Sequence, residues 1–285
     1  MRPSRSAARA RSTRARTSPP TYRCPSASTT RDGTTTGSNE APGSDSRRLG
    51  VYTTARVARG RVVRAEQHAR RLVRDAKRIG LSDPGREAIE RLLVRTARDA
   101  FADREGIVRI EWSLQRDGSP HLDASTRALG PDPDRFRAAS STIVHPGPTG
   151  GRGAKIVGRP ELDAARAEAV ARGVDEVLLF DAGGCLVEGS RSNLLLVTAD
   201  GRLATPALEL GAVEGLALEV VRAALATPVD AIRARRTEVL AARELMACNA
   251  VRGVVPIVRL DDEPVGDGRP GPWARRLGAL SFRGA

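Results

Sequence analysis

A stretch from His145 to Ala154, with two prolines and four glycines, separates two regions that both carry helix and strand patterns. Proline and glycine interrupt regular structure, so such a segment is typical of a connection between folding units. We therefore predict an α+β fold with two lobes and a cleft between them. The smaller lobe is expected over residues 49–145, the interdomain loop over 146–153 and the larger lobe over 154–285.

Apolar spacing predicts the elements of each lobe. The smaller lobe is expected to hold two short strands around a turn, two helices and two strand-like segments, over 52–63, 65–81, 84–101, 106–116 and 135–144. The larger lobe is expected to hold a helix, three strands and a helix, over 160–172, 176–181, 185–189, 193–198 and about 213–226. Further short strands and a helix are expected toward the C-terminus.

Residues 1–48 are rich in Ser, Thr, Arg, Pro and Gly and nearly lack large apolar residues. Such a composition cannot bury enough surface to offset the entropy of ordering, so we predict a disordered basic tail. Ten arginines and three acidic residues give this tail a charge of +7, which leaves +6 of the chain's +13 for the rest. In the rest, acidic residues alternate with arginines as on solvated helix faces, so we expect no nucleic-acid partner.

Several classes of protein are disfavoured by what the sequence lacks. No apolar run approaches the roughly 18 residues needed to span a membrane, and no signal-peptide pattern is present. We therefore expect no membrane partner and a cytoplasmic location. The cysteines, Cys24, Cys185 and Cys248, lie far apart, and the chain has only three histidines. A disulfide framework, a metal site and a histidine-based hydrolase are accordingly not expected.

Lysine is scarce in this arginine-rich chain and is therefore informative. Only Lys77 and Lys155 are present. A lysine amine can deprotonate and attack a carbonyl, which a guanidinium cannot do. Lys77 lies in an amphipathic helical pattern and is interpreted as a surface cation. Lys155 directly follows the Gly- and Pro-rich loop and is the candidate for covalent chemistry.

Six segments from about residue 49 to 275 resemble, in order, those of fold type IV pyridoxal-phosphate enzymes, the class IV aminotransferases. These segments are GVYTTARV, HARRL, AKIVGR, VDEVLLFDAGGCLVEGSRSNLLLV, ATPALELGAVEGL and ARELMACNAVRGVVPI. The family includes branched-chain and D-amino-acid aminotransferases and 4-amino-4-deoxychorismate lyase. The resemblance implies pyridoxal 5'-phosphate as cofactor. The family's first hairpin has no counterpart before Gly50, so an inactive relative is one alternative.

The resemblance implies catalytic and cofactor-binding roles for three polar residues. Lys155 matches the Schiff-base lysine, with Arg159 four residues later as in many members. Glu188 matches the carboxylate that pairs with the pyridine nitrogen, and Asn193 fits the pattern E-x-S-x-x-N. Without the family, a surface lysine, an edge-strand glutamate and a turn-capping asparagine remain alternative interpretations.

The resemblance also implies a phosphate cradle made of one side chain and two loops. Its members are Arg71, Gly215, Leu216, Ala217, Asn249 and Ala250. A guanidinium suits a phosphate dianion, and a helix that begins near Gly215 would present backbone N–H groups to it. Ala217 lacks the hydroxyl that is common at its position.

The choice of reaction rests on two short segments. YTTARV and CNA are similar to the forms in aminodeoxychorismate lyases, so we predict conversion of 4-amino-4-deoxychorismate to 4-aminobenzoate and pyruvate. The alternative is an aminotransferase that acts on branched-chain or D-amino acids, since both reactions begin with loss of a proton beside the substrate nitrogen. An inactive relative, or an arginine-rich nucleic-acid-binding protein that keeps the fold, is the second alternative.

Substrate and subunit partners follow from the same resemblance. The substrate is expected to be a small carboxylate, with Arg109 as its first cation and Arg116 as its second. Tyr52, Thr53 and Thr54 are expected to line the substrate pocket. We predict a homodimer, because the family builds its cofactor sites beside a subunit interface.

Overall fold

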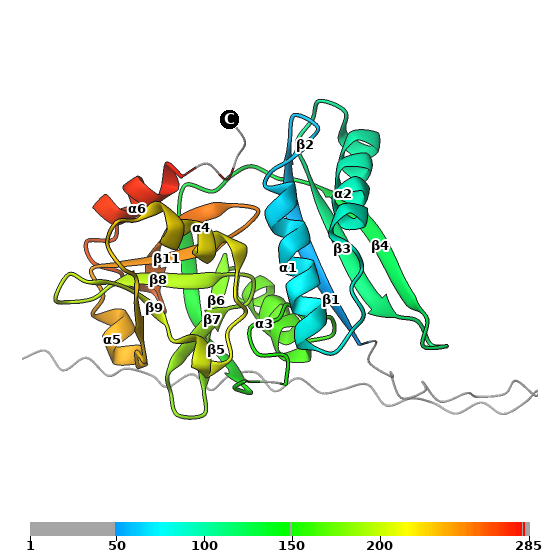
Figure 1. The fold of residues 1–285 in the computed structure, drawn as a ribbon. Coiled ribbons are helices and arrows are strands. Elements are labelled where there is room, and N and C mark those ends of the chain that lie inside the picture. Colours follow the sequence, from blue (N-terminus) through cyan, green and yellow to red (C-terminus); the bar gives the residue numbers. More distant parts are fainter. Residues whose placement is uncertain (1–48, 149, 281, 283–285) are drawn as a thin grey trace, which may run out of the picture. The chain divides into compact units, whose positions relative to one another are not determined.

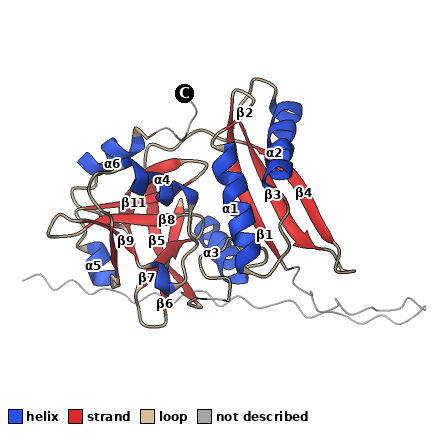
Figure 2. Ribbon diagram, viewed as in Figure 1, coloured by secondary structure: helices blue, strands red, loops and turns tan. Residues whose placement is uncertain are grey.

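The computed structural model describes residues 49–148, 150–280 and 282. The basic tail predicted over residues 1–48 lies outside the described residues. Two β-sheets organise the described chain, and Figure 1 and Figure 2 show the helices that accompany each of them. The predicted α+β class is confirmed. The division into lobes at residues 146–153 stays a prediction.

The smaller sheet is antiparallel, with the strand order β2-β1-β3-β4. Its elements are β1 (Gly50–Ala58), β2 (Arg61–Val62), α1 (Ala65–Arg78), α2 (Arg86–Phe101), β3 (Gly106–Leu114) and β4 (Pro120–Ala128). Helices α1 and α2 lie side by side on one face of the sheet (Figure 1). Apolar residues from both helices and from β1 and β3 form one core, as their 3.6- and 2-residue spacings predict.

Alternation along β1 decides which of its side chains can reach a ligand. Val51, Thr53 and Ala55 are fully buried, and the two apolar side chains belong to the core beneath α1 and α2. The intervening Tyr52 and Thr54 are only half-buried and lie on the opposite face of the sheet. Successive strand residues point to opposite faces, so one face of β1 serves the core and the other is available for a site.

The larger sheet has the strand order β10-β9-β8-β11-β12-β5-β6-β7, with β13 paired to β12. Its strands are β5 (Phe136–His145), β6 (Glu176–Asp181), β7 (Leu186–Gly189), β8 (Asn193–Val197), β9 (Leu203–Pro206), β10 (Asp230–Ile232), β11 (Glu244–Asn249), β12 (Gly253–Leu260) and β13 (Glu263–Pro264). The accompanying helices are α3 (Pro160–Ala171), the 3-10 turn η1 (Leu208–Leu210), α4 (Leu216–Ala224), α5 (Arg236–Leu240) and α6 (Pro272–Gly278). Strands β7 and β8 are buried along their whole length, and this includes the polar side chains of Glu188 and Asn193.

Three elements differ from the sequence predictions. Strand β5 was expected in the smaller lobe, but it pairs with β6 and β12 in the larger sheet. An alternating pattern predicts a strand but not its partners, which explains the error. Strand β4 was not predicted, because its polar sequence has no buried residue and forms the sheet edge. Helix α4 begins at Leu216, three residues later than predicted.

Among the described residues, no helix is both long enough and apolar enough to cross a bilayer. The same part of the chain holds no group of three or more His, Cys, Asp or Glu side chains placed to bind a metal ion.

Candidate functional site

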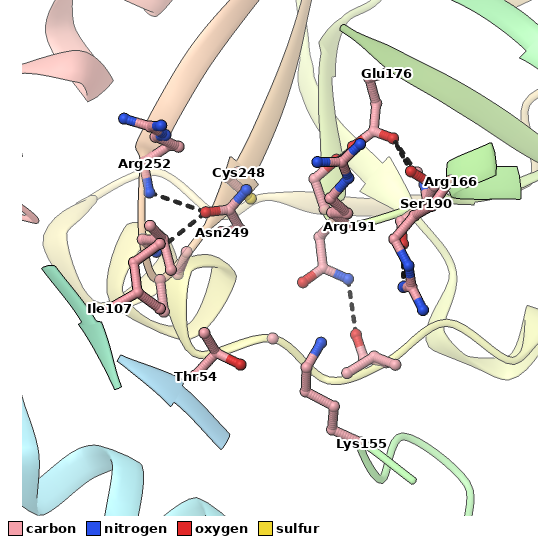
Figure 3. Close-up of a pocket in the computed structure, with 18 of the residues that line it drawn as sticks. Thr54, Ile107, Lys155, Arg166, Glu176, Ser190, Arg191, Cys248, Asn249 and Arg252 are labelled. Carbon is pink, nitrogen blue, oxygen red and sulfur yellow. Dashed lines mark hydrogen bonds between the residues drawn. The ribbon is translucent and has the colours of Figure 1, made fainter. Parts of the chain in front are cut away.

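A cavity of about 780 Å³ is lined by residues of both sheets (Figure 3). With two exceptions, Thr53 and Arg116, the site residues predicted from the sequence line it. These are Tyr52, Thr54, Arg71, Arg109, Lys155, Glu188, Asn193, Gly215, Leu216, Ala217, Asn249 and Ala250. Residues that lie far apart in the sequence thus meet around one space.

The backbone around Lys155 is fixed by hydrogen bonds to β1 and α1. The Lys155 N–H donates to the Asp75 carboxylate at 3.1 Å, and its carbonyl accepts from the Tyr52 N–H at 3.0 Å. The Val157 N–H donates to the Gly50 carbonyl at 2.9 Å. These bonds hold the lysine beside the smaller sheet, and Figure 3 shows its amine directed into the cavity.

The Lys155 amine lies 4.7 Å from the centre of the Tyr52 ring. Burial of the amine, helped by the charge of Arg71, lowers the pKa of Lys155, against the opposing effects of Tyr52 and Glu188. Burial opposes ionisation of Tyr52, but Lys155, Arg109 and Arg166 together lower the pKa of its hydroxyl. Because burial is the largest of these effects, Lys155 gives up its proton more readily than a lysine in water, although Tyr52 opposes this.

Arg71 projects from α1 and is almost completely buried. One of its Nη atoms donates to the Tyr52 carbonyl at 3.2 Å, while its Nε lies 3.5 Å from the Asp75 carboxylate. That buried Nε makes no hydrogen bond within the described chain. A buried guanidinium with an unsatisfied N–H suits an additional anion.

The loop before α4 is shaped by Glu188 and Asn193. Glu188 Oε2 accepts from the Val213 N–H at 3.0 Å, and Asn193 Nδ2 donates to the Val213 carbonyl at 2.7 Å. A Cβ on Gly215 would lie 1.9 Å from Asn193 Oδ1, so only glycine allows this approach. The first N–H groups of α4, which begins directly after Gly215, have no intrahelical acceptors and can bind an anion.

The other Glu188 oxygen, Oε1, lies among nitrogen donors. His145 Nε2 is 3.3 Å away and Arg159 Nη1 is 3.5 Å away, and all three side chains are buried. His145 Nδ1 accepts from the Gly147 N–H at 3.0 Å, while its Nε2 lies 3.0 Å from Arg159 Nη2 as well as near Glu188. The sequence analysis did not include His145 in the site. The feature of the sequence that could have identified His145 is its position at the start of the connector, where β5 ends.

The end of β11 closes another side of the cavity. Asn249 Oδ1 accepts from the N–H groups of Val251 and Arg252, at 3.0 and 2.9 Å, as the dashed lines in Figure 3 show. These bonds fix a turn that places Asn249 and Ala250 on the cavity wall. Both residues therefore lie where the sequence analysis expected them, and their role in binding the cofactor stays a prediction.

Thr53 and Arg116 do not lie where the sequence analysis expected them. The Thr53 hydroxyl is fully buried and lies 2.7 Å from His68 Nδ1, on the face of β1 that packs under α1. Assigning three consecutive strand residues to one pocket neglected the alternation of faces. Arg116 follows the end of β3 and is not part of the cavity wall.

Arg109, the first predicted substrate cation, does line the cavity and already has two partners. Its guanidinium carbon lies 3.6 Å from the centre of the Tyr52 ring, and its Nη2 donates to Glu111 at 2.8 Å. Cavity residues that the sequence analysis missed include Arg127, Arg166, Glu176, Ser190, Arg191 and Arg252. In an arginine-rich chain, the sequence alone does not indicate which arginines lie at a functional site.

Comparison with known families gives one match over most of the chain. Residues 50–260 match the family model described as Amino-transferase class IV. A curated relative, a probable branched-chain-amino-acid aminotransferase of Thermotoga maritima, is 36% identical over 126 residues. The alignment covers 43% of this chain and 45% of that relative, so the chain spans less than half the length of this curated relative.

Solved structures share the fold over most of both chains. The branched-chain aminotransferase of Thermoproteus uzoniensis with norvaline gives a TM-score of 0.72 at 27% identity, covering 82% of this chain and 84% of that one. A putative branched-chain amino acid aminotransferase of Thermotoga maritima gives 0.68 at 26% identity, covering 82% and 86%. A putative 4-amino-4-deoxychorismate lyase of Legionella pneumophila gives 0.70 at 20% identity, covering 80% and 88%, which shows likeness of fold alone.

Proposed function

From the premise that this chain belongs to the class IV aminotransferase family, we propose that it transfers an amino group between an amino acid and a 2-oxo acid. The observation that carries the proposal is Lys155, a lysine with a lowered pKa directed into a cavity beside Glu188 and Arg71. The lyase favoured in the sequence analysis becomes the second candidate. Its support is two short motifs, whereas the curated relative and the two structures above 25% identity carry branched-chain aminotransferase names.

Pyridoxal phosphate is the cofactor of the family, and the residues around the cavity fit it. The unsatisfied Nε of Arg71, the Gly215 turn and the start of α4 suit its phosphate. Glu188 offers a buried carboxylate for a protonated ring nitrogen, and Lys155 offers an amine for covalent attachment. Ala217 contributes no hydroxyl, so the phosphate would rely on Arg71 and on backbone N–H groups. When bound, pyridoxal phosphate withdraws electrons from the carbon that carries the substrate nitrogen.

We assign the proton transfer at the substrate carbon to Lys155. Its lowered pKa increases the neutral fraction near pH 7, and a neutral amine accepts a proton where an ammonium cannot. Tyr52 packs beside this amine and favours its charged form, which opposes the larger effect of burial. The lysine is thus suited both to take up and to return one proton.

Glu188 is proposed to keep the cofactor's nitrogen protonated. Arg159 and the Nε2 of His145 approach its Oε1, while the Val213 N–H occupies Oε2. These contacts hold the carboxylate in place, and an anion beside a pyridine nitrogen favours the pyridinium. Arg159 and His145 act as positioning residues through Glu188.

Three further expectations belong to the same proposal. The substrate is a small carboxylate, for which the arginines of the cavity supply charge. The protein works as a homodimer, since the family builds its cofactor sites beside a subunit interface. The cytoplasmic location and the absence of a nucleic-acid partner stay predictions from the sequence.

Product analysis tests the proposed reaction. Purified protein loaded with pyridoxal phosphate is incubated with leucine or glutamate plus a 2-oxo acid, and separately with 4-amino-4-deoxychorismate. A new amino acid, detected by mass spectrometry and absent with Lys155→Ala, supports the aminotransferase. Formation of 4-aminobenzoate and pyruvate without amino transfer would replace it with the lyase.

A further inference from the structure

The groups that suit the cofactor phosphate come from elements that pack on different sheets. Arg71 belongs to α1, which covers the smaller sheet, whereas Gly215 and the start of α4 accompany the larger sheet. One phosphate can meet both only if α1 and the loop before α4 keep a fixed separation, because hydrogen bonds need donor–acceptor distances near 2.9 Å. Glu214, the residue directly before Gly215, lies where the two elements meet.

Glu214 is held to α1 through both its side chain and its backbone. Its Oε2 is shielded from solvent, with Arg78 Nη1 at 2.6 Å and Arg74 Nη1 at 3.8 Å. Arg74 also donates from Nη2 to the Glu214 carbonyl at 3.4 Å. The side chains of Glu214 and Arg78 are 30% and 32% exposed, so water weakens this attraction without removing it. The loop before α4 is therefore fastened to the helix that carries Arg71.

The segment that leads to Lys155 packs against the same two side chains. The Gly153 carbonyl accepts from the Glu214 N–H at 2.8 Å. A Cβ on Gly153 would lie 3.1 Å from Arg78 Nη1 and 3.2 Å from Glu214 Cβ, and its φ of +75° is one that L side chains rarely adopt. A larger residue at this position would press on both partners of the ion pair. Glycine thus allows the Lys155 segment, α1 and the loop before α4 to meet at one point.

Asp75 connects this ion pair to Arg71. Its Oδ1 lies 3.8 Å from Arg78 Nη1, and its Oδ2 lies 3.5 Å from Arg71 Nε. Residues three and four positions apart share one face of a helix, so Arg71, Asp75 and Arg78 form a row of alternating charge along α1. Glu214 completes that row from the neighbouring element. One charge network therefore includes the arginine and the loop that the phosphate needs.

By its charge alone, Glu214 is badly placed for a phosphate site. It directly precedes the turn that suits a phosphate dianion, and like charges repel each other. A carboxylate at this position weakens anion binding unless it acts through the groups that it holds. Its contacts with α1 supply such an action, because they fix the turn that presents the N–H groups.

We propose that Glu214, through its ion pair with Arg78, is a positioning residue for the cofactor phosphate. The pair sets the loop before α4 against α1, so that Arg71 and the first N–H groups of α4 reach the same phosphate. The inference rests on the proposed function for the place of the cofactor, and it holds whichever reaction follows. Neither Glu214 nor Arg78 has to touch the phosphate to perform this role.

Two ligands that differ in the phosphate test this role without turnover. Full-length protein freed of cofactor is titrated with pyridoxal phosphate and with pyridoxal, and fluorescence gives both affinities. We expect Glu214→Gln to weaken binding of pyridoxal phosphate about three- to tenfold, the range for a partly exposed ion pair within a network. Pyridoxal has no phosphate, so its affinity should stay within about twofold. Arg78→Gln should give the same selective loss, and Arg78→Lys, which keeps the charge, should retain most of the affinity.

The double variant Glu214→Gln, Arg78→Gln separates positioning from simple charge. Acting by charge alone, Glu214→Gln would strengthen binding of the dianion and Arg78→Gln would weaken it, so the double variant would bind like the unmodified protein. Acting as a pair, the two residues predict a double variant within about twofold of either single variant. Recovery of affinity in the double variant, losses that add in it, or tighter binding by Glu214→Gln would each overturn the proposal.

Glu66→Gln is the matched control, because Glu66 lies at the other end of α1 and forms a 2.7 Å ion pair with Arg86 outside the cavity wall. It should leave both affinities unchanged. Equal losses for the two ligands in Glu214→Gln and Arg78→Gln would assign the pair to general stability and reject the phosphate role. A selective loss in a protein without amino transfer rejects the proposed function alone, whereas amino transfer without a selective loss rejects this inference alone.

Discussion

The Lys155 backbone N–H is bound to the carboxylate of Asp75, a fully buried side chain of α1, at 3.1 Å. The same carboxylate lies 3.3 Å from Arg74 and 3.8 Å from Arg78. One acidic group therefore ties the segment that carries Lys155 to a helix that is rich in positive charge. Both the stability of α1 and the position of the lysine depend on it.

Asp75→Ala is predicted to lower the free energy of unfolding by about 3–5 kcal/mol, because it leaves the buried guanidinium of Arg71 without its ion-pair partner. Asp75→Asn should cost less, since its amide oxygen still accepts from the Lys155 N–H. Urea denaturation followed by circular dichroism measures both. Equal stability of Asp75→Ala and the unmodified protein would contradict this role.

Lys155→Ala is predicted to abolish turnover, with a loss larger than the roughly 10²–10⁴-fold typical of removing acid–base help alone. Lys155→Arg should fail equally, because a guanidinium supplies charge without a nucleophile. Borohydride reduction followed by peptide mapping should place the cofactor on Lys155. Lys77→Ala is the control, and a label on Lys77 would reject the assignment.

Tyr52→Phe is predicted to move the acidic limb of the kcat/KM profile to lower pH. The Tyr52 hydroxyl raises the pKa of Lys155 by charge and by a hydrogen bond, against the larger effect of burial. Without it the amine loses its proton at lower pH, so the active neutral form appears earlier. A limb that stays in place, or moves to higher pH, would show that another group controls it.

His68 is predicted to make the fold sensitive to acid. Burial, followed by the charges of Arg71 and Arg64, lowers the pKa of His68 from 6.5 to about 3. The unfolded chain therefore binds this proton first as the pH falls, and the stability that depends on the neutral ring is lost between about pH 6.5 and 3. His68→Gln should flatten the stability–pH curve there by up to about 1.4 kcal/mol per pH unit. Parallel curves for the two proteins would exclude His68 as the cause.

Gly215→Ala is predicted to weaken cofactor binding, because its Cβ would collide with Asn193 Oδ1 and displace the loop before α4. Fluorescence titration with pyridoxal phosphate measures the affinity. Gly150→Ala is the matched control, since no atom lies within 4 Å of a Cβ built there. Unchanged affinity of Gly215→Ala for pyridoxal phosphate would reject this explanation.

The sequence predicted the fold class and most helices and strands, because long apolar periodicities dominate α1, α2, β6 and β8. Lys155 and Glu188 could be proposed because a scarce lysine and an ordered set of motifs mark them. His145 and Glu214 could not, since their importance arises only when the fold brings distant segments together. The sheet to which β5 belongs was mispredicted for the same reason: strand partners depend on contacts far along the chain.

The segment from His145 to Ala154 also bears on how the protein tolerates engineering. A glycine- and proline-rich linker is an ordinary choice for inserting a tag or rejoining the chain in a new order. Here its first residue lies against Glu188, and Gly153 near its end, two residues before Lys155, accepts a hydrogen bond from the Glu214 N–H at 2.8 Å. Added length at this point would therefore disturb two sides of the cofactor cavity at once. The exposed turn between β3 and β4, around Gly118, offers a safer place for an insertion.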